Sequence, residues 1–226
     1  MKTRRRICIA LGASLTLGLT GVAVAASATP PAGTPDLASM ALQPGDLAAG
    51  AVASSQGYVT PVTGFTAQYD GIFTTAATPD GVSYYDVTDG VSYVADASAV
   101  STFFTDEQAL FNSKRGHELF DKGFIRAAGR KAHIKASEIK FKDAGSVGVG
   151  GGSFLLRIGV SHKHTSIHED LVSFEQGTVY VQLVVVGKPN EKVPDSDAVQ
   201  LATAIDSHVN SVLASIGATG PTGATQ

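Results

Sequence analysis

The sequence has few residues that could support thiol or disulfide chemistry. Its 226 residues contain one cysteine, Cys8, and no tryptophan. A single thiol cannot form an internal disulfide, and nothing beyond Cys8 can act as a catalytic thiol or a thiolate metal ligand. Stability must therefore come from a buried core, which a chain of this length can form as one domain. With 43% hydrophobic and 16% charged residues, the composition is that of a globular protein and not of a highly charged disordered one.

The first 26 residues have the pattern of an export signal. Lys2 and Arg4–Arg6 form a cationic start, Ile7–Ala25 is an apolar stretch, and the small residues at 23–26 suit cleavage. Glycine, serine and threonine interrupt the apolar stretch, which argues against a retained membrane anchor, and no later segment is apolar enough to span a bilayer. We therefore expect a secreted or envelope-associated product with no retained span.

Charge is unevenly distributed along the remaining chain. Beyond residue 26 there are 13 Lys and Arg against 20 Asp and Glu, a net charge of −7, which disfavours nucleic acid as a partner. Asp36–Ser113 holds nine acids and no Lys or Arg, whereas Lys114–Lys142 holds nine bases against three acids. The basic segment either binds an anionic partner, such as an envelope polymer, a lipid head group or an acidic protein, or faces the acidic half of its own domain.

The periodicity of apolar residues predicts a single domain over 36–216, after a Pro-rich flexible linker at 27–35 and before a disordered Gly/Thr-rich tail at 217–226. Alternating patterns predict strands and helical stripes predict helices. Expected strands lie within Gly57–Thr75, Val82–Ala95, Ile134–Phe141, Ser153–Val160, Ile167–Glu175 and Thr178–Val186, and expected helices start at Asp96, Lys114 and Pro194. Asp70-Gly71, Asp80-Gly81 and Asp89-Gly90 suggest tight turns or bulges. This order predicts an α+β fold, an antiparallel β-sheet with helices packed on it.

Three segments resemble pieces of exported bacterial proteins with the PsbP-like α/β/α sandwich, and the sensor domains of some bacterial receptor kinases are similar too. The segments are Leu42–Ala51, Phe174–Val181 and Asp197–Asp206. The resemblance implies a non-enzymatic binding or sensor-like protein of the envelope or extracellular space, whose ligand is an unknown small molecule or envelope component. It assigns no functional residue, and we expect no cofactor.

The densest group of potential ligands lies in Ser161–Asp170, which holds three of the six histidines. In a hairpin with its turn near Thr165, His162 and His164 would share a strand face and His168 would lie opposite His162. The three imidazoles could then bind zinc or copper. A register shift of one residue would separate them, leaving an exposed polar hairpin tip. A metal-binding protein is therefore one alternative function.

A hydrolase with an unrecognised site is the other alternative. His117-Glu118 begins like a zinc-protease helix motif, but Asp121 stands where the second histidine would be. The glycine-rich Gly145–Gly152 precedes a predicted strand, whereas a phosphate-binding loop precedes a helix. No Gly-x-Ser-x-Gly occurs beyond the export signal. His208 lies close to the apolar stripe of the last helix and is expected to be a partly buried, hydrogen-bonded histidine.

Overall fold

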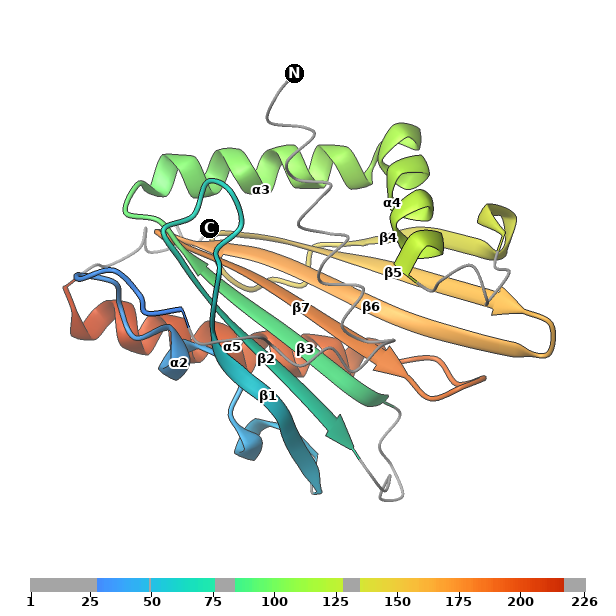
Figure 1. Cartoon of the computed structure of the whole chain (residues 1–226), viewed down its shortest axis with the longest axis horizontal. Coiled ribbons are helices and arrows are strands. Elements are labelled where there is room, and N and C mark those ends of the chain that lie inside the picture. The colour runs from blue at the N-terminus through green and yellow to red at the C-terminus, as the bar shows by residue number, and fades with distance from the viewer. Residues whose placement is uncertain (1–27, 49, 76–83, 128–134, 218–226) are drawn as a thin grey trace.

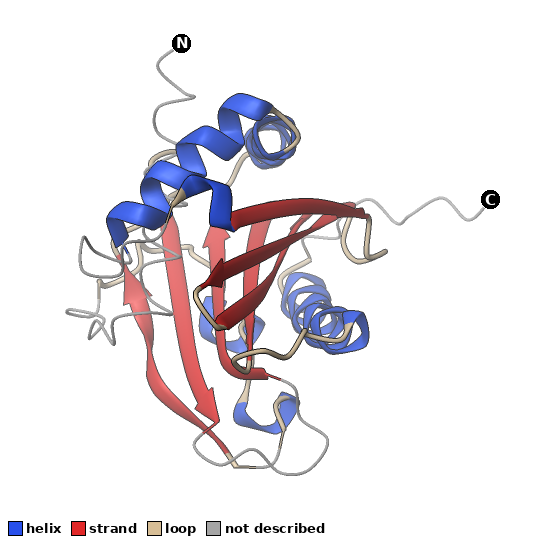
Figure 2. Ribbon diagram, turned by 90° about the vertical axis from the view of Figure 1, so that its right-hand side faces the viewer, coloured by secondary structure: helices blue, strands red, loops and turns tan. Residues whose placement is uncertain are grey.

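The computed structural model describes residues 28–48, 50–75, 84–127 and 135–217, and in this part the chain is a seven-stranded antiparallel sheet with helices on both faces (Figures 1 and 2). The spatial strand order is β1-β2-β3-β7-β6-β5-β4. The strands are β1 (Ala51–Val59), β2 (Ala67–Thr75), β3 (Tyr84–Tyr93), β4 (Ile139–Gly145), β5 (Gly152–His162), β6 (Thr165–Gln176) and β7 (Val179–Gly187). The α+β class expected from the sequence is confirmed.

Different helices cover the two faces of the sheet. On one face, called the α3 face, lie α3 (Ala97–Phe111) and α4 (Lys114–Ala127); the opposite α5 face carries α2 (Leu37–Met40) and α5 (Asp195–Ser215). Two short 3-10 turns, η1 (Pro44–Asp46) and η2 (Ala136–Glu138), precede β1 and β4. Since side chains alternate along a strand, each face has its own apolar layer.

The central strand, β7, contributes side chains to both apolar layers. On the α5 face, Val181, Leu183 and Val185 of β7 are fully buried together with Ile205 and Val209 of α5. On the α3 face, the buried cluster is formed by Val100, Phe104, Phe111, Phe154, Leu156, Leu171, Tyr180 and Val184 among others. The nearly continuous apolar run of β7 predicts a strand covered on both faces, and its position in the middle of the sheet confirms this.

Helices α3, α4 and α5 begin within one residue of the predicted starts at Asp96, Lys114 and Pro194, whereas the short α2 was not predicted. Asp96 caps α3, because its side chain accepts a hydrogen bond from the Ser98 backbone N–H at 2.9 Å. α5 ends just before Gly217, whose φ of 71° is the left-handed conformation that glycine adopts readily. β6 and β7 form a hairpin, because the two strands pair directly with Gln176 opposite Val179.

Two of the predicted Asp-Gly turns are instead paired segments of neighbouring strands. Asp70 lies opposite Gly90 and Gly71 lies opposite Asp89, in the middle of β2 and β3. Each carboxylate therefore extends over a glycine of the adjacent strand, Asp70 on the α3 face and Asp89 on the α5 face. The turn prediction was wrong for these two pairs because glycine here makes room for an aspartate instead of bending the chain. Asp80-Gly81 lies outside the described residues.

Element boundaries at the sheet edges also differ from expectation. Edge strand β1 begins at Ala51, six residues before the predicted strand, and edge strand β4 begins at Ile139 where a strand was expected from Ile134. Residues 28–35 have no regular structure, but they contact the domain: the Ala28 N–H donates to Tyr58 O at 3.0 Å and Pro35 is buried. The predicted export signal at 1–26 and residues 218–226 of the predicted tail lie outside the described residues. None of the described helices is long and apolar enough to cross a membrane.

Candidate functional site

The predicted three-histidine cluster is divided between the two faces of the sheet. The β5–β6 turn is formed by Lys163 and His164, with Lys163 at a φ of 56°, so His162 lies opposite Thr165 and His168 lies opposite Gly159. His162 therefore points to the α3 face and His168 to the α5 face. The predicted pairing of His168 with His162 was wrong, because the turn is centred before Thr165. Among the described residues, no group of three or more His, Cys, Asp or Glu side chains is placed to hold a metal ion.

The other histidines also have structural contacts. His162 Nδ1 lies 3.2 Å from Glu138 Oε1, and the His117 ring stacks on Phe141 with centroids 4.6 Å apart. This stacking brings α4 close to β4. His208 is partly buried and hydrogen-bonded, as expected: its Nδ1 lies 3.1 Å from Ala41 O.

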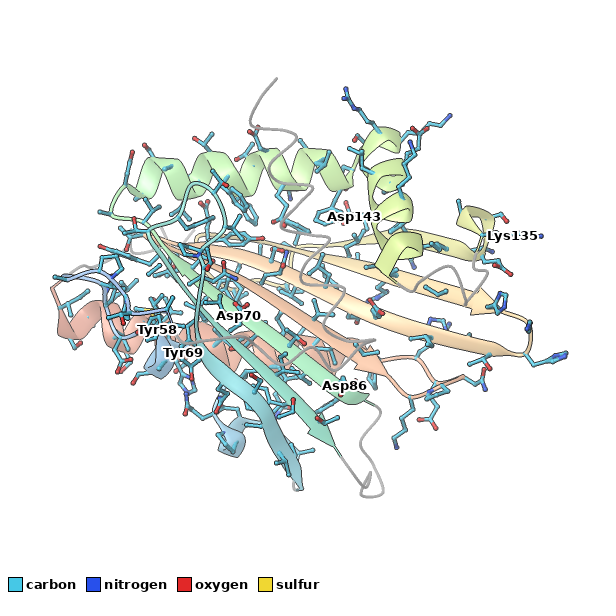
Figure 3. The ribbon with its side chains drawn as sticks, viewed as in Figure 1. Tyr58, Tyr69, Asp70, Asp86, Lys135 and Asp143 are labelled. Atoms are coloured by element: carbon cyan, nitrogen blue, oxygen red, sulfur yellow. The ribbon has the colours of Figure 1, made fainter. Side chains whose placement is uncertain are left out.

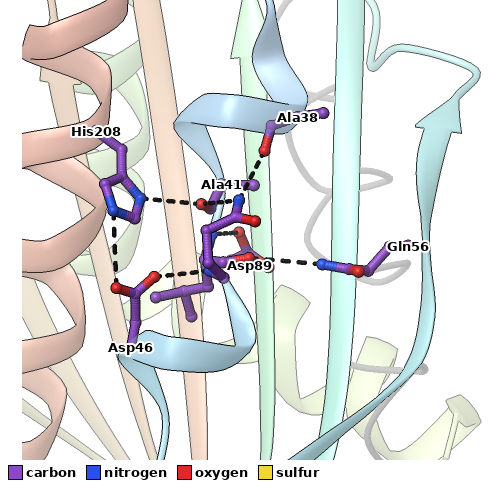
Figure 4. A network of polar contacts seen from close by, with 8 residues as sticks. Ala38, Ala41, Asp46, Gln56, Asp89 and His208 are labelled. Atoms are coloured by element: carbon purple, nitrogen blue, oxygen red, sulfur yellow. Dashed lines mark hydrogen bonds and ion pairs between the residues drawn. The ribbon is translucent and has the colours of Figure 1, made fainter.

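His208 belongs to a polar network that holds residues 38–46 against the sheet and α5 (Figure 4). Its Nε2 lies 3.7 Å from Asp46 Oδ1, and Asp46 Oδ2 accepts a hydrogen bond from the Gln43 N–H at 2.7 Å. The fully buried Asp89 accepts the Leu42 N–H at 2.9 Å. Burial raises the pKa of Asp89 to about 7, with the nearby Asp70 adding to the rise. The network fixes α2, η1 and the residues between them, which is a structural role.

A second buried network lies beneath α3. Glu107 is 1% exposed, and both of its carboxylate oxygens are hydrogen-bonded: Oε2 accepts from the Tyr180 hydroxyl, and Oε1 accepts from Gln182 Nε2 at 3.1 Å. Ser173 Oγ lies 3.3 Å from the same hydroxyl. Burial raises the pKa of Glu107 to about 7. Because each member has a partner, the network ties α3 to β6 and β7.

A line of polar residues, called the polar row, continues from this network across the α3 face. The pairing of β2, β3, β7 and β6 sets four residues side by side: Asp70, Gly90, Gln182 and Ser173. Gln182 is only partly buried, and Asp70 of β2 is partly exposed; Figure 3 labels it together with Asp86 of the adjacent strand β3. A methyl group at Gly90 would lie 3.2 Å from Asp70 Oδ1, so the glycine gives the Asp70 carboxylate room to extend along the row.

Two carboxylates of the α3 face, Asp70 and Asp86, have no cationic partner among the residues that the structure describes. Asp70 is hydrogen-bonded by Gln68 Nε2 at 2.7 Å, and burial still raises its pKa to about 6. Burial likewise raises the pKa of Asp86 to about 6. Neither forms an ion pair within the described ranges, as expected for a stretch without Lys or Arg from Asp36 to Ser113. A cationic group arriving beside Asp70 would restore its ionised form, which makes the polar row a candidate binding site.

The described residues do not assemble a hydrolytic site. A serine nucleophile needs a histidine base held by a third group. The hydrogen bonds of His162 and His208 go to Glu138 and to Ala41 O, and neither is bonded to a serine within the described part of the chain. The glycine-rich segment 145–152 leads into β5, as predicted, and not into a helix.

Comparisons with known proteins leave the family open. No family profile matches the chain, and no curated protein matches it. Among solved structures, the protein of unknown function PA94 from Pseudomonas aeruginosa is similar over 70% of this chain and 85% of its own, with 15% sequence identity and a TM-score of 0.30. A TM-score this low supports neither a shared fold nor a shared function.

Proposed function

We propose that this chain is an exported, non-enzymatic binding or sensor-like protein of the cell envelope or extracellular space, and that its ligand carries a cationic amine that contacts the polar row. The layered build, with helices on both faces of one antiparallel sheet, is compatible with the PsbP-like sandwich that the sequence resembles. The export signal supports the location, since the pattern of residues 1–26 has no other evident use.

The observation that carries the proposal is Asp70, a partly exposed carboxylate without a cationic partner in the described structure. Its pKa of about 6 means that burial opposes ionisation. A structural carboxylate is expected to be saturated by hydrogen bonds, as Glu107 is, but Asp70 receives one side-chain hydrogen bond, from Gln68. Gly90 beside it has no side chain that could bond or cover the carboxylate. An amine would supply the missing charge and further hydrogen bonds.

Calorimetric titration with spermidine as the probe tests this proposal. Asp70→Asn keeps the shape but removes the charge, and losing a charged hydrogen bond of about 1.5–3 kcal/mol should weaken binding roughly 10- to 100-fold. Asp36→Asn is the matched control: it removes an acid of the same half, and asparagine caps α2 as well as aspartate does.

Binding should also be tighter at pH 7.5 than at pH 5, because Asp70 is ionised only above about pH 6. Equal weakening in both variants would indicate a general charge effect and overturn the site. The absence of any heat with the unsubstituted chain would overturn the amine as the ligand class.

A further inference from the structure

Two features of the sequence, the histidine cluster and the basic segment, meet at one position on the α5 face. The pairing of β4 with β5 sets Lys140 opposite Gly159, and the pairing of β5 with β6 sets Gly159 opposite His168. Their side chains point to the α5 face, because Gly159 lies four residues from Leu155, which packs in that core. Lys140 and His168 therefore flank Gly159 from its two neighbouring strands.

Positive charge dominates around this glycine. Lys142 and Arg157 occupy the next row on the same face, and Lys140 and Lys142 are both exposed. Neither lysine forms an ion pair within the described ranges. On the α5 face, strands β4, β5 and β6 carry one acid, Asp170. The register sets Asp170 opposite Arg157 and not opposite Gly159. Since Asp170 is 3% exposed, it offers little surface to a ligand.

The space over Gly159 is open. A methyl group there would meet Nδ1 and Cε1 of His168 at 3.6 and 3.8 Å, and it would meet no other atom within 4 Å outside the adjacent residues. Neighbouring strands lie about 4.8 Å apart, so the Cα atoms of Lys140 and His168 are roughly 10 Å apart with the glycine between them. Neither ring nitrogen of His168 is hydrogen-bonded within the described part of the chain, which leaves an N–H available to a ligand.

We propose that Gly159 is the floor of an oxyanion site in which Lys140 and His168 hold a phosphate group from a small soluble molecule, with Lys142 and Arg157 adding positive charge from the next row. The ammonium group and the imidazole N–H donate to the oxyanion from two sides, while the missing side chain at Gly159 lets it approach the sheet. The site is on the opposite face from the polar row and does not depend on the proposed function.

The division of the basic segment favours a small ligand over an extended polymer. Lys114, Arg115 and Lys122 belong to α4, which packs on the α3 face, whereas Lys140 and Lys142 point to the α5 face. A polymer following the basic segment would have to cross the β4 edge to reach both groups. A single phosphate group needs only the space over one glycine.

The test uses inorganic phosphate as the probe, with the full chain, at constant ionic strength and pH 7, followed by amide NMR spectroscopy. We expect shift changes confined to 139–142 and 157–168. Lys140→Gln should weaken binding by about 10-fold, since a charged hydrogen bond is lost. Lys114→Gln, an exposed lysine on α4, is the matched control and should leave the affinity unchanged.

Gly159→Val fills the floor of the site without requiring a change of fold, because valine is favoured in strands and its Cβ has room beside His168. It should abolish phosphate binding with little change in thermal stability. Unchanged binding in Gly159→Val or in Lys140→Gln would overturn the proposal. So would equal weakening in Lys114→Gln and Lys140→Gln, which would indicate diffuse charge attraction. The proposal would also fail if a phosphate polymer bound more tightly than inorganic phosphate and Lys114→Gln weakened that binding. The ligand would then be a polymer and not a small molecule.

Discussion

The reciprocal Asp-Gly pairs of β2 and β3 predict very different effects for two substitutions of the same chemical type. At Gly71, a methyl group would overlap Asp89 Oδ1 and lie 2.9 Å from Phe73 Cε2, both of which are buried. Asp89 cannot move away without losing its hydrogen bond to the Leu42 N–H. At Gly90, the nearest atom is Asp70 Oδ1 at 3.2 Å, at the end of a partly exposed side chain that can turn aside.

The magnitude for Gly71→Ala follows from two contributions. Overpacking in a core costs about 1–3 kcal/mol, and leaving the buried partners of the Asp89 hydrogen bond unpaired costs about 1–3 kcal/mol more. We expect a loss of about 2–6 kcal/mol in the free energy of unfolding. Gly90→Ala should change it by less than about 1 kcal/mol, because alanine also lowers the entropy of the unfolded chain. Neither glycine has a positive φ, so backbone strain does not separate the two.

Urea unfolding followed by circular dichroism measures both variants. With an m value of about 2 kcal/mol per molar urea, Gly71→Ala should lower the midpoint by roughly 1–3 M. Both glycines lie in the same sheet and receive the same substitution. The difference between the two urea midpoints therefore reports the contact with Asp89. Midpoints that fall equally in both variants would refute the assignment of Gly71 as the space for that carboxylate.

Three further predictions concern titration, a helix cap and export. Glu169 is 4% exposed, and burial raises its pKa from 4.5 to about 7. Between these values the folded state keeps a proton that the unfolded state releases. The free energy of unfolding therefore falls as the pH rises from about 4 to about 7. Glu169→Gln should stabilise the fold by about 2–3 kcal/mol at pH 8 and by almost nothing at pH 4, as chemical unfolding at both pH values can check. Asp96→Ala removes the α3 cap and should cost about 1 kcal/mol in the same assay. Finally, N-terminal sequencing of the product exported by a bacterial host should find a start close to residue 27, and an intact N-terminus in the cytosol would contradict the export signal.

The parts of the fold that the sequence predicts well are those set by local signals. The stripe of Val100, Phe104 and Phe111 and the cap at Asp96 define α3 without reference to other elements. The long apolar run of β7 similarly indicates a central strand. β1 begins earlier than predicted because Ala51–Gln56 contains one β-branched residue and no aromatic one, so its pairing with β2 determines its structure.

The candidate sites were harder to predict because they depend on register between strands. Lys163 adopts a positive φ that its side chain gives no reason to expect, and this turn decides that His168 meets Gly159 and not His162. Taken alone, Asp70-Gly71 and Asp89-Gly90 are turn signals. In the sheet, however, Gly71 lies opposite Asp89 and Gly90 lies opposite Asp70. The charge pattern did carry a signal for this site: no Lys or Arg occurs from Asp36 to Ser113, and Asp70 and Asp86 form no ion pair with any residue that the structure describes.

The strand order has a consequence for how the chain reaches its native state. β1, β2 and β3 form one meander and β4, β5, β6 and β7 form another, each made of consecutive antiparallel neighbours. In the sheet, the two meanders pair with each other through β3 and β7. There Val87 lies opposite Val185, which follows it by almost a hundred residues in the sequence. Closing so long a loop is entropically costly, so we expect each meander to assemble early and their union at β3 and β7 to limit the folding rate.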